Sequence, residues 1–536
     1  MGTPISWLGM LYSLMCLATF AALGAGEENP DSRGTHIEMI RTYRGCCSQC
    51  LVLSNYTQPG PYTLETFLIY MEGEFVLSKD DQMNCYLMVG VAVRLAMRMG
   101  LHRDSDNVAG SISPYQGEIR RRIWHLLVQI DLLVSFHIGL PAMVQSIESD
   151  TRFPHNLPDQ DFDEDTIDLP PSRPDTEMTS MSYTICKGRI CQVFGKVAEQ
   201  ANLLSLPQYD EVLKLDELLN QAFSKVPYFF RVIPIELSIT DSPQLIMQRL
   251  SLALLFHKTR CVLHRKYLMK ENENHEFSCS KKAGIDASME LLYIQSEIHA
   301  AVQPGGPLSK DLWFVSSLSM HDFLLAAMIV YLSLIQDTES SRRKTSSSQP
   351  PTKQQEEIIN ALDRSYRIWS QTKSMSVDAR KAYEVLGIMM KRVNAVLERN
   401  NGDEIVLTGA DHAGGHKGTD FMSGLTLNGM CRWQFYSIME LFLPHHPSND
   451  SYRLRITNQN LEPTRSTGIP TGISDPLGRG QFGGSDDTTP SSGLAMQFDL
   501  DSMPMPMDSL GAMIDTPTNF DWVRAFIARP NASNEY

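Results

Sequence analysis

Apolar residues recur every three or four positions as far as about residue 400, and this period restricts the fold more than any other feature of the chain. The segment that Pro114 opens shows it in the positions Ile119, Ile123, Leu126, Leu127, Ile130 and Val134. Such spacing makes one face of an amphipathic helix apolar, and proline suits a first helical turn. Gly139 and Pro141 end the segment. Because the two-residue alternation of β-strands is rare, we predict an all-α, multi-helix fold.

Changes in composition divide the chain into four parts. We predict a helical domain over residues 1–337, with a long loop rich in Pro and Asp at 154–174. Residues 338–353 contain Ser, Thr, Arg, Lys and a Pro-Pro pair, which predicts a linker. A helical pair that packs on the domain is predicted at 354–399, and a mostly disordered, low-complexity tail at 400–536. Within the domain, helices are expected at 183–204, 209–226, 245–268, 279–302 and 312–335.

The apolar segment at residues 7–23 has two interpretations. Small residues follow it, as at the cleavage site of a signal peptide, and N-glycosylation triplets begin at Asn55, Asn449 and Asn531. However, no Lys or Arg precedes Arg33, and the segment is short for a membrane span of about 20 residues. We therefore predict a core helix here, with a secreted or membrane-anchored α-helical protein as the alternative.

The charge of the chain argues against intrinsic DNA binding. Its formal net charge is −15, whereas a domain that grips phosphates is normally basic or has a basic face. The most basic segment is the run Arg120, Arg121 and Arg122. Because neighbouring residues point in different directions around a helix, these three do not form one basic face. We expect some of them to pair with buried carboxylates that fix helix packing, and Asp131 is the carboxylate we favour.

No cysteine or histidine pattern predicts a metal site. Cys47 and Cys50 form a C-x-x-C beside Cys46, but the next cysteine is Cys85, and a structural zinc site needs a second pair of ligands nearby. The histidines at 412, 416, 445 and 446 lie in loops without partners at ligand spacing. We expect the ten cysteines to be reduced, buried thiols.

Catalytic and cofactor motifs are equally weak. Gly478, Gly480 and Gly483 match G-x-G-x-x-G in a Pro- and Gly-rich setting without a preceding strand. G-x-S-x-G, Walker and H-E-x-x-H motifs do not occur. We therefore predict no catalytic, cofactor-binding, metal-binding or DNA-binding residues in this chain, and no enzyme activity.

The tail contains an acidic and hydrophobic stretch. Residues 486–521 have no Lys, Arg or His, and they interleave Phe498, Leu500 and Phe520 with Asp499, Asp501 and Asp521. This composition is typical of amphipathic activation segments, which a partner groove takes as a short helix. The alternative is a tail that docks on its own domain.

Several motifs in a fixed order resemble the fungal-specific transcription factor domain, the regulatory middle region of zinc-cluster transcription factors. The resemblance covers roughly residues 1–399. Its motifs are WLGMLYSLMCLA at 7–18, AVRLAMRMGLHRD at 92–104, EIRRRIW at 118–124, Asp131, GLP at 139–141, the loop at 154–161, CVLHR at 261–265 and HDFLLAA at 321–327.

The resemblance implies a nuclear transcriptional regulator of RNA polymerase II genes in a metabolic or secondary-metabolite pathway. Family members carry an N-terminal zinc cluster, which we expect to be missing here. Zinc is therefore expected only in that missing cluster and not in this chain. DNA would then be contacted through it or through a partner protein, and the transcription machinery through the acidic tail. A dimer and a small-molecule effector are further partners that the resemblance implies, and we expect no membrane partner. A DNA-free corepressor or scaffold stays open as an alternative.

Overall fold

A computed structural model describes residues 3–24, 35–77, 82–108, 110, 112–203, 207–268, 275–309, 318–344, 351–374 and 377–401. In these ranges the regular elements are α-helices and short 3-10 turns, with no strand, which confirms the all-α prediction. The α-helices are α1 (Ile5–Gly24), α2 (His36–Leu53), α3 (Thr63–Leu77), α4 (Gln82–Arg98), α5 (Pro114–His137), α6 (Ser182–Ala201), α7 (Tyr209–Ser224), α8 (Pro243–His264), α9 (Ser278–Ala301), α10 (Leu318–Lys344), α11 (Lys353–Thr372) and α12 (Val377–Asn401).

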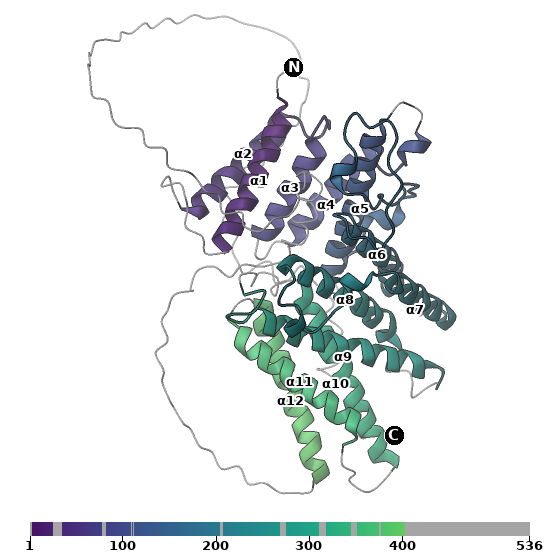
Figure 1. Ribbon diagram of the computed structural model, residues 1–536. Helices are drawn as coiled ribbons and strands as arrows, with labels where there is room; N and C mark the ends of the chain where they lie inside the picture. Colours follow the sequence, from purple (N-terminus) through teal and green to yellow (C-terminus); the bar gives the residue numbers. More distant parts are fainter. Residues whose placement is uncertain are drawn as a thin grey trace, which may run out of the picture. The chain divides into compact units, whose positions relative to one another are not determined.

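The first three helices pack on one another, with α1 against both α2 and α3 (Figure 1). Gly9 lets α1 approach closely, because a Cβ there would lie 3.0 Å from Cys50 Cβ and from Thr66 Cγ2. Hydrogen bonds fix the contact: Ser6 Oγ donates to the Pro61 carbonyl at 2.6 Å, and Thr66 Oγ1 donates to the Ser6 carbonyl at 2.7 Å.

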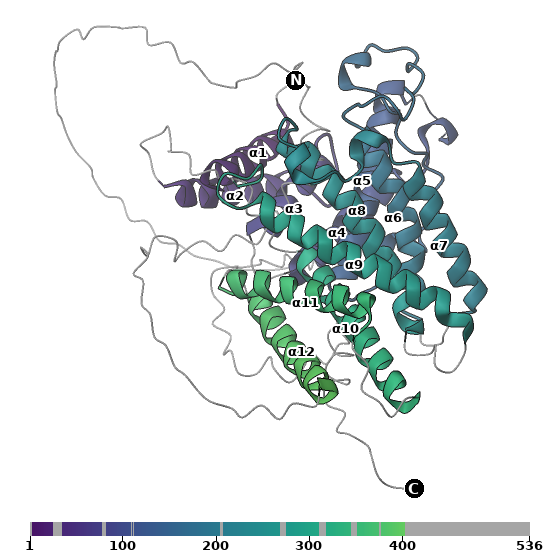
Figure 2. The same cartoon turned by 60° about the horizontal axis from the view of Figure 1, so that its bottom comes forward.

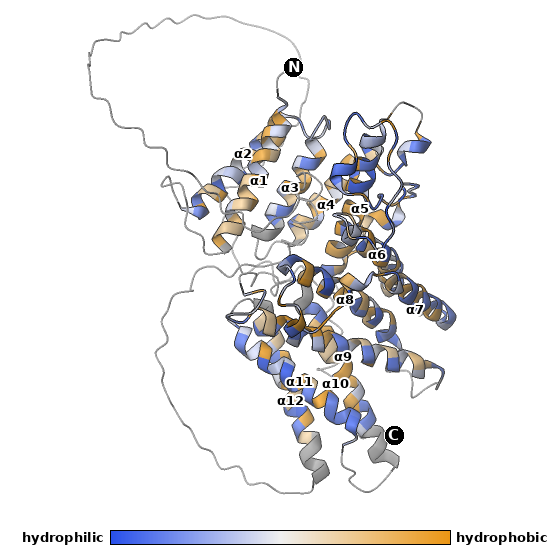
Figure 3. Cartoon of the chain, in the orientation of Figure 1, coloured by the Kyte–Doolittle hydropathy of each residue, from blue (hydrophilic) through white to orange (hydrophobic). Residues whose placement is uncertain are grey.

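The prediction of a core helix holds for only one face of α1. Ser13, Cys16 and Leu17 are buried, but Ile5 and Leu8 are 44% and 40% exposed. Figure 3 shows α1 coloured from neutral to hydrophobic over most of its length. By length and composition, the stretch Ile5–Leu23 is apolar enough to cross a membrane, and 28% of it is buried against the rest of the protein.

Helix α8 packs against helices from both earlier and later in the chain. It packs against α6, α7, α9 and α10, and Figures 1 and 2 both place it beside α9. Ser242 caps its first turn by accepting a hydrogen bond from the Leu245 amide, and Pro243 follows the cap. The chain connects this group to α1–α3 through α4 and α5, which pack in sequence order.

Helix α5 begins where the sequence predicts it. Pro114 is its first residue, and Ser113 Oγ accepts a hydrogen bond from the Gln116 amide at 3.3 Å. Gly139 follows the helix with φ of 75°, a left-handed conformation that glycine adopts without steric cost. The predicted loop at 154–174 contains a single short 3-10 turn, Asp159–Asp161, and is otherwise irregular.

The predicted linker begins too early in the sequence. Helix α10 continues to Lys344, well past residue 338. Lys281 of α9 forms an ion pair with Asp337 at 2.6 Å, and Thr338 Oγ1 donates to the Leu334 carbonyl at 2.8 Å. These contacts stabilise helical structure in a segment whose composition suggests a loop.

Helices α11 and α12 pack on each other, and both contact α10. They cover nearly the same residues as the predicted helical pair at 354–399. Thr352 begins α11 with a capping box: its side chain accepts from the Gln355 amide, and the Gln355 side chain accepts from the Thr352 amide. The tail predictions at 402–536, including the glycine motif, the four loop histidines and the acidic stretch, lie outside the described residues.

Candidate functional site

The arginine run of α5 lies at the centre of a buried ion-pair network. Arg121 donates to Asp104 from Nε at 2.9 Å and from Nη2 at 2.6 Å, and these side chains are 3% and 0% exposed. Arg122 donates to Glu118 at 3.0 Å and to Asp159 at 2.5 Å. The expected pairing of these arginines with buried carboxylates is therefore confirmed.

Asp131 is not a partner of the arginine run, so the sequence prediction was wrong on this point. It lies nine residues after Arg122, or about 13 Å along a helix axis, too far for a direct contact. Its carboxylate instead accepts from the Val144 amide at 2.8 Å and from Ser135 Oγ at 3.3 Å. Burial raises the pKa of Asp131. The residue thus fixes the 3-10 turn Met143–Ser146, which follows the Gly-Leu-Pro segment.

The same carboxylates hold the long loop against α5. Asp104 Oδ2 accepts from the Arg152 amide at 2.9 Å, and Glu118 accepts from His155 through its amide at 3.1 Å and Nδ1 at 2.8 Å. Burial raises the pKa of Asp104, but hydrogen bonds from Arg121 and Arg152 outweigh it and hold that pKa below its usual value. The motifs at 92–104, 118–124 and 154–161 therefore meet in one structural network.

A second buried ion pair joins α8 to α10. Lys258 Nζ lies 3.0 Å from Asp322 Oδ1, with side chains 6% and 10% exposed. The ammonium group also lies 5.1 Å from the centre of the Phe136 ring in α5. This pair was not predicted from the sequence, where its only signs are a lysine, Lys258, in an apolar helical segment and Asp322 in the HDFLLAA motif.

Two histidines lie beside this ion pair. The rings of His137 and His321 meet edge to face with centres 4.7 Å apart. Burial lowers the pKa of His137 well below its usual value, and the nearby His321 and Lys258 lower it further. The imidazole of His137 is therefore neutral at physiological pH, and the cluster binds α5, α8 and α10 together.

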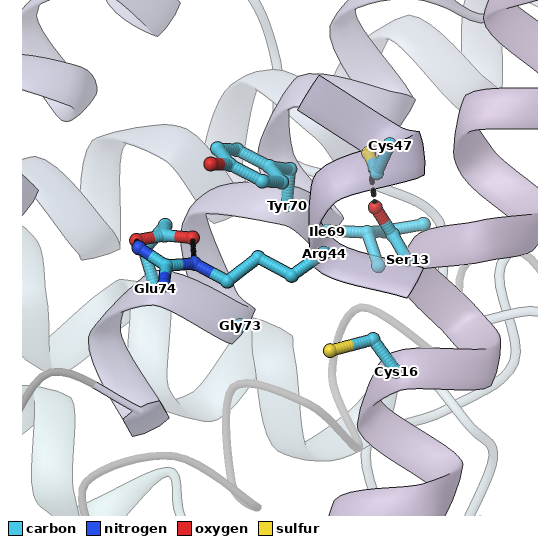
Figure 4. Close-up of a pocket in the computed structure, with 8 residues that line it drawn as sticks. All are labelled: Ser13, Cys16, Arg44, Cys47, Ile69, Tyr70, Gly73 and Glu74. Carbon is cyan, nitrogen blue, oxygen red and sulfur yellow. Dashed lines mark hydrogen bonds and ion pairs between the residues drawn. The ribbon is translucent and has the colours of Figure 1, made fainter. Parts of the chain in front are cut away.

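A small polar hollow lies where α1, α2 and α3 meet (Figure 4). Arg44 forms an ion pair with Glu74, and Ser13 Oγ lies 2.7 Å from Cys47 Sγ. The volume of about 10 Å³ is enough for one water molecule at most. Burial raises the pKa of Cys16 and of Cys47 to about 12, so both thiols stay protonated.

The C-x-x-C residues do not converge on this hollow. Cys47 is buried there, whereas Cys46 and Cys50 are half-exposed. In the described ranges, no three His, Cys, Asp or Glu side chains are placed to hold a metal ion. All nine described cysteines are free thiols. Cys46 and Cys50 are half-exposed and Cys279, in the first turn of α9, is exposed, so the prediction that all cysteines are buried was wrong for these three. Cys431 lies outside the described residues.

Comparison with known proteins gives a family for the ion-pair region. Residues 55–217 match the fungal specific transcription factor domain. No solved structure matches the chain.

Similar curated proteins carry names of the same kind. The chain is 36% identical over 390 residues to the Zn(2)-C6 fungal-type transcription factor pigI of Monascus ruber, covering 73% of this chain and 47% of that protein. It is 37% identical over 409 residues to mpsB of Macrophomina phaseolina, another Zn(2)-C6 fungal-type transcription factor. This match covers 76% of this chain and 55% of mpsB. The equisetin cluster transcription factor eqxF of Fusarium heterosporum is 36% identical over 399 residues, covering 73% and 56%.

The chain spans about half the length of the curated relatives that it matches. Within this chain, residues 55–217 contain Asp104, the arginine run of α5, Asp131 and the long loop. The resemblance predicted from these motifs is therefore confirmed.

Proposed function

We propose that this chain, which carries a fungal specific transcription factor domain, is the regulatory part of a nuclear transcription factor for RNA polymerase II genes. The observation that carries the proposal is the domain match at residues 55–217, together with relatives named as transcription factors over about three quarters of the chain. The helical domain supplies a rigid scaffold, because its motifs are used in buried ion pairs and not in an open catalytic centre.

The genes controlled belong to a secondary-metabolite pathway. Relatives named for the equisetin and fusarisetin A clusters support this choice. The net charge of −15 disfavours direct contact of these residues with DNA. DNA is instead contacted through a zinc cluster outside these residues or through a partner protein. The relatives' names do not point to an enzyme.

The test is to disrupt the gene, measure transcripts across the genome, and follow a fluorescent fusion of the protein. We expect the fusion in the nucleus and a change in the transcripts of a group of metabolic genes, restored when the unaltered gene is returned. A stable protein outside the nucleus, with unchanged transcripts, would contradict the proposal. Recovery of a zinc-cluster protein by pull-down from nuclear extract would favour contact with DNA through a partner.

A further inference from the structure

A cavity of about 470 Å³ lies between α7, α8 and α9, and all of its lining residues come after the range 55–217 that matches the domain family. Sites for small organic molecules are commonly clefts of about 300–1,000 Å³ with an apolar lining and a few polar groups. Ala253 and Ile294 provide a buried apolar floor, with exposures of 4% and 2%. The size and the floor suit a molecule of that kind.

Aromatic side chains give the cavity flat walls. Phe223 lines it and is held by stacking on Phe256, with ring centres 4.1 Å apart and planes inclined by 17°. Tyr293 of α9, 40% exposed, also lines the cavity. Offset stacking favours a planar ligand against such rings.

His257 also lines this cavity. Its Nδ1 is buried, and among the described residues no group forms a hydrogen bond with it. A buried polar atom without a partner costs free energy. Burial, and then the charge of Arg260, lower the pKa of His257 to about 4, so the ring is neutral at physiological pH.

Two exposed charges line the same cavity, Arg231 and Glu290. In the part of the chain that the structure describes, neither forms an ion pair, although Arg231 Nε lies 3.5 Å from the Val226 carbonyl. Arginine binds carboxylates through paired, charge-assisted hydrogen bonds. Glu290 would repel the same group, and this gives the two positions opposite expected effects.

We infer that this cavity binds a small planar organic acid, whose ring lies on the apolar floor and whose carboxylate pairs with Arg231. The biological role of this binding rests on the proposed function, because a bound metabolite would then regulate a transcription factor. Binding itself is a property of α7, α8, α9 and the segment between α7 and α8 that carries Arg231.

The test uses the purified full chain and two matched probes, 2-naphthoate and its neutral analogue 2-naphthamide. Each is titrated against the dye 1-anilinonaphthalene-8-sulfonate, and loss of dye fluorescence measures displacement. We expect 2-naphthoate to displace the dye, with Arg231→Gln weakening naphthoate binding about tenfold or more and leaving naphthamide unchanged. Glu290→Gln should strengthen naphthoate binding, since it removes a like charge.

Two further variants keep the result interpretable. Arg103→Gln removes an exposed arginine in the turn after α4 and should bind as the unaltered chain does. Ala253→Phe fills the floor and should abolish binding of both probes while the far-ultraviolet circular dichroism spectrum is retained. Equal naphthoate binding in the Arg231→Gln and Arg103→Gln variants, or no displacement at all, overturns the inference. Because binding is measured without transcription, this failure differs from a failure of the proposed function, which the transcript experiment detects.

Discussion

Arg121 and Asp104 form an ion pair in which neither side chain is open to water. Their exposures are 3% and 0%, and two hydrogen bonds join them. Removal of Arg121 leaves the buried Asp104 carboxylate with the hydrogen bonds from Arg152, so its charge is compensated in part. Arg367 and Asp363 of α11 form a pair one turn apart on the surface, with exposures of 74% and 37%. Solvent and salt screen that second pair, so its contribution to stability is small.

The substitution Arg121→Gln is therefore expected to lower the free energy of unfolding by about 3–5 kcal/mol. The matched change Arg367→Gln should lower it by less than about 1 kcal/mol. Urea unfolding followed by circular dichroism measures both. Losses of equal size would show that the buried pair has no special part in holding the turn after α4 to α5.

His257 makes stability depend on pH. Its pKa is about 4 in the folded protein and near 6.5 in an unfolded chain. Between these values the unfolded state binds more protons than the folded state, so stability decreases as pH falls from about 6.5 to about 4. His257→Gln should reduce the loss of unfolding free energy between pH 7 and pH 5, as measured by urea titration at each pH. An unchanged difference would contradict the burial of this ring, and His36→Gln at the start of α2 serves as the control.

Local sequence signals predicted helix starts better than helix ends. Pro114 and Tyr209 are the first residues of α5 and α7, as predicted, because proline and the residues before each helix act locally. The end of α10 could not be predicted in this way, since its contact with α9 through Lys281 and Asp337 joins residues far apart in the sequence. The partner of Arg121 was missed for the same reason: Asp104 comes from the turn after α4.

The cap of α5 contributes to the stability of the domain through a local hydrogen bond. Ser113 Oγ accepts from the Gln116 amide, which has no partner within the helix. Ser113→Ala should lower the free energy of unfolding by about 1 kcal/mol, and Ser113→Asp should retain most of it. Thermal unfolding of the three proteins distinguishes these outcomes. A loss of the same size in both variants would mean that the hydroxyl has a different partner.

The structural features of the chain differ in how well the sequence alone predicts them. The buried network of α5 was visible as motifs, because each of its segments is continuous in the sequence. The cavity between α7, α8 and α9 was not, because its lining comes from separate helices and each residue type there is ordinary on its own. The acidic stretch at 486–522 is recognised from its composition alone and lies outside the described residues.

We expect residues 486–522 to activate transcription when fused to an unrelated DNA-binding domain. The physical reason is that its acidic residues keep Phe498, Leu500, Phe520 and Trp522 in solvent until a partner groove buries them. Replacement of these four residues by alanine should abolish the rise in reporter output over the DNA-binding domain alone. A control with alanine at Ser491, Ser492, Thr516 and Thr518 changes as many positions and should keep the rise. Output that never exceeds the DNA-binding domain alone would instead favour a tail that docks on its own helical domain.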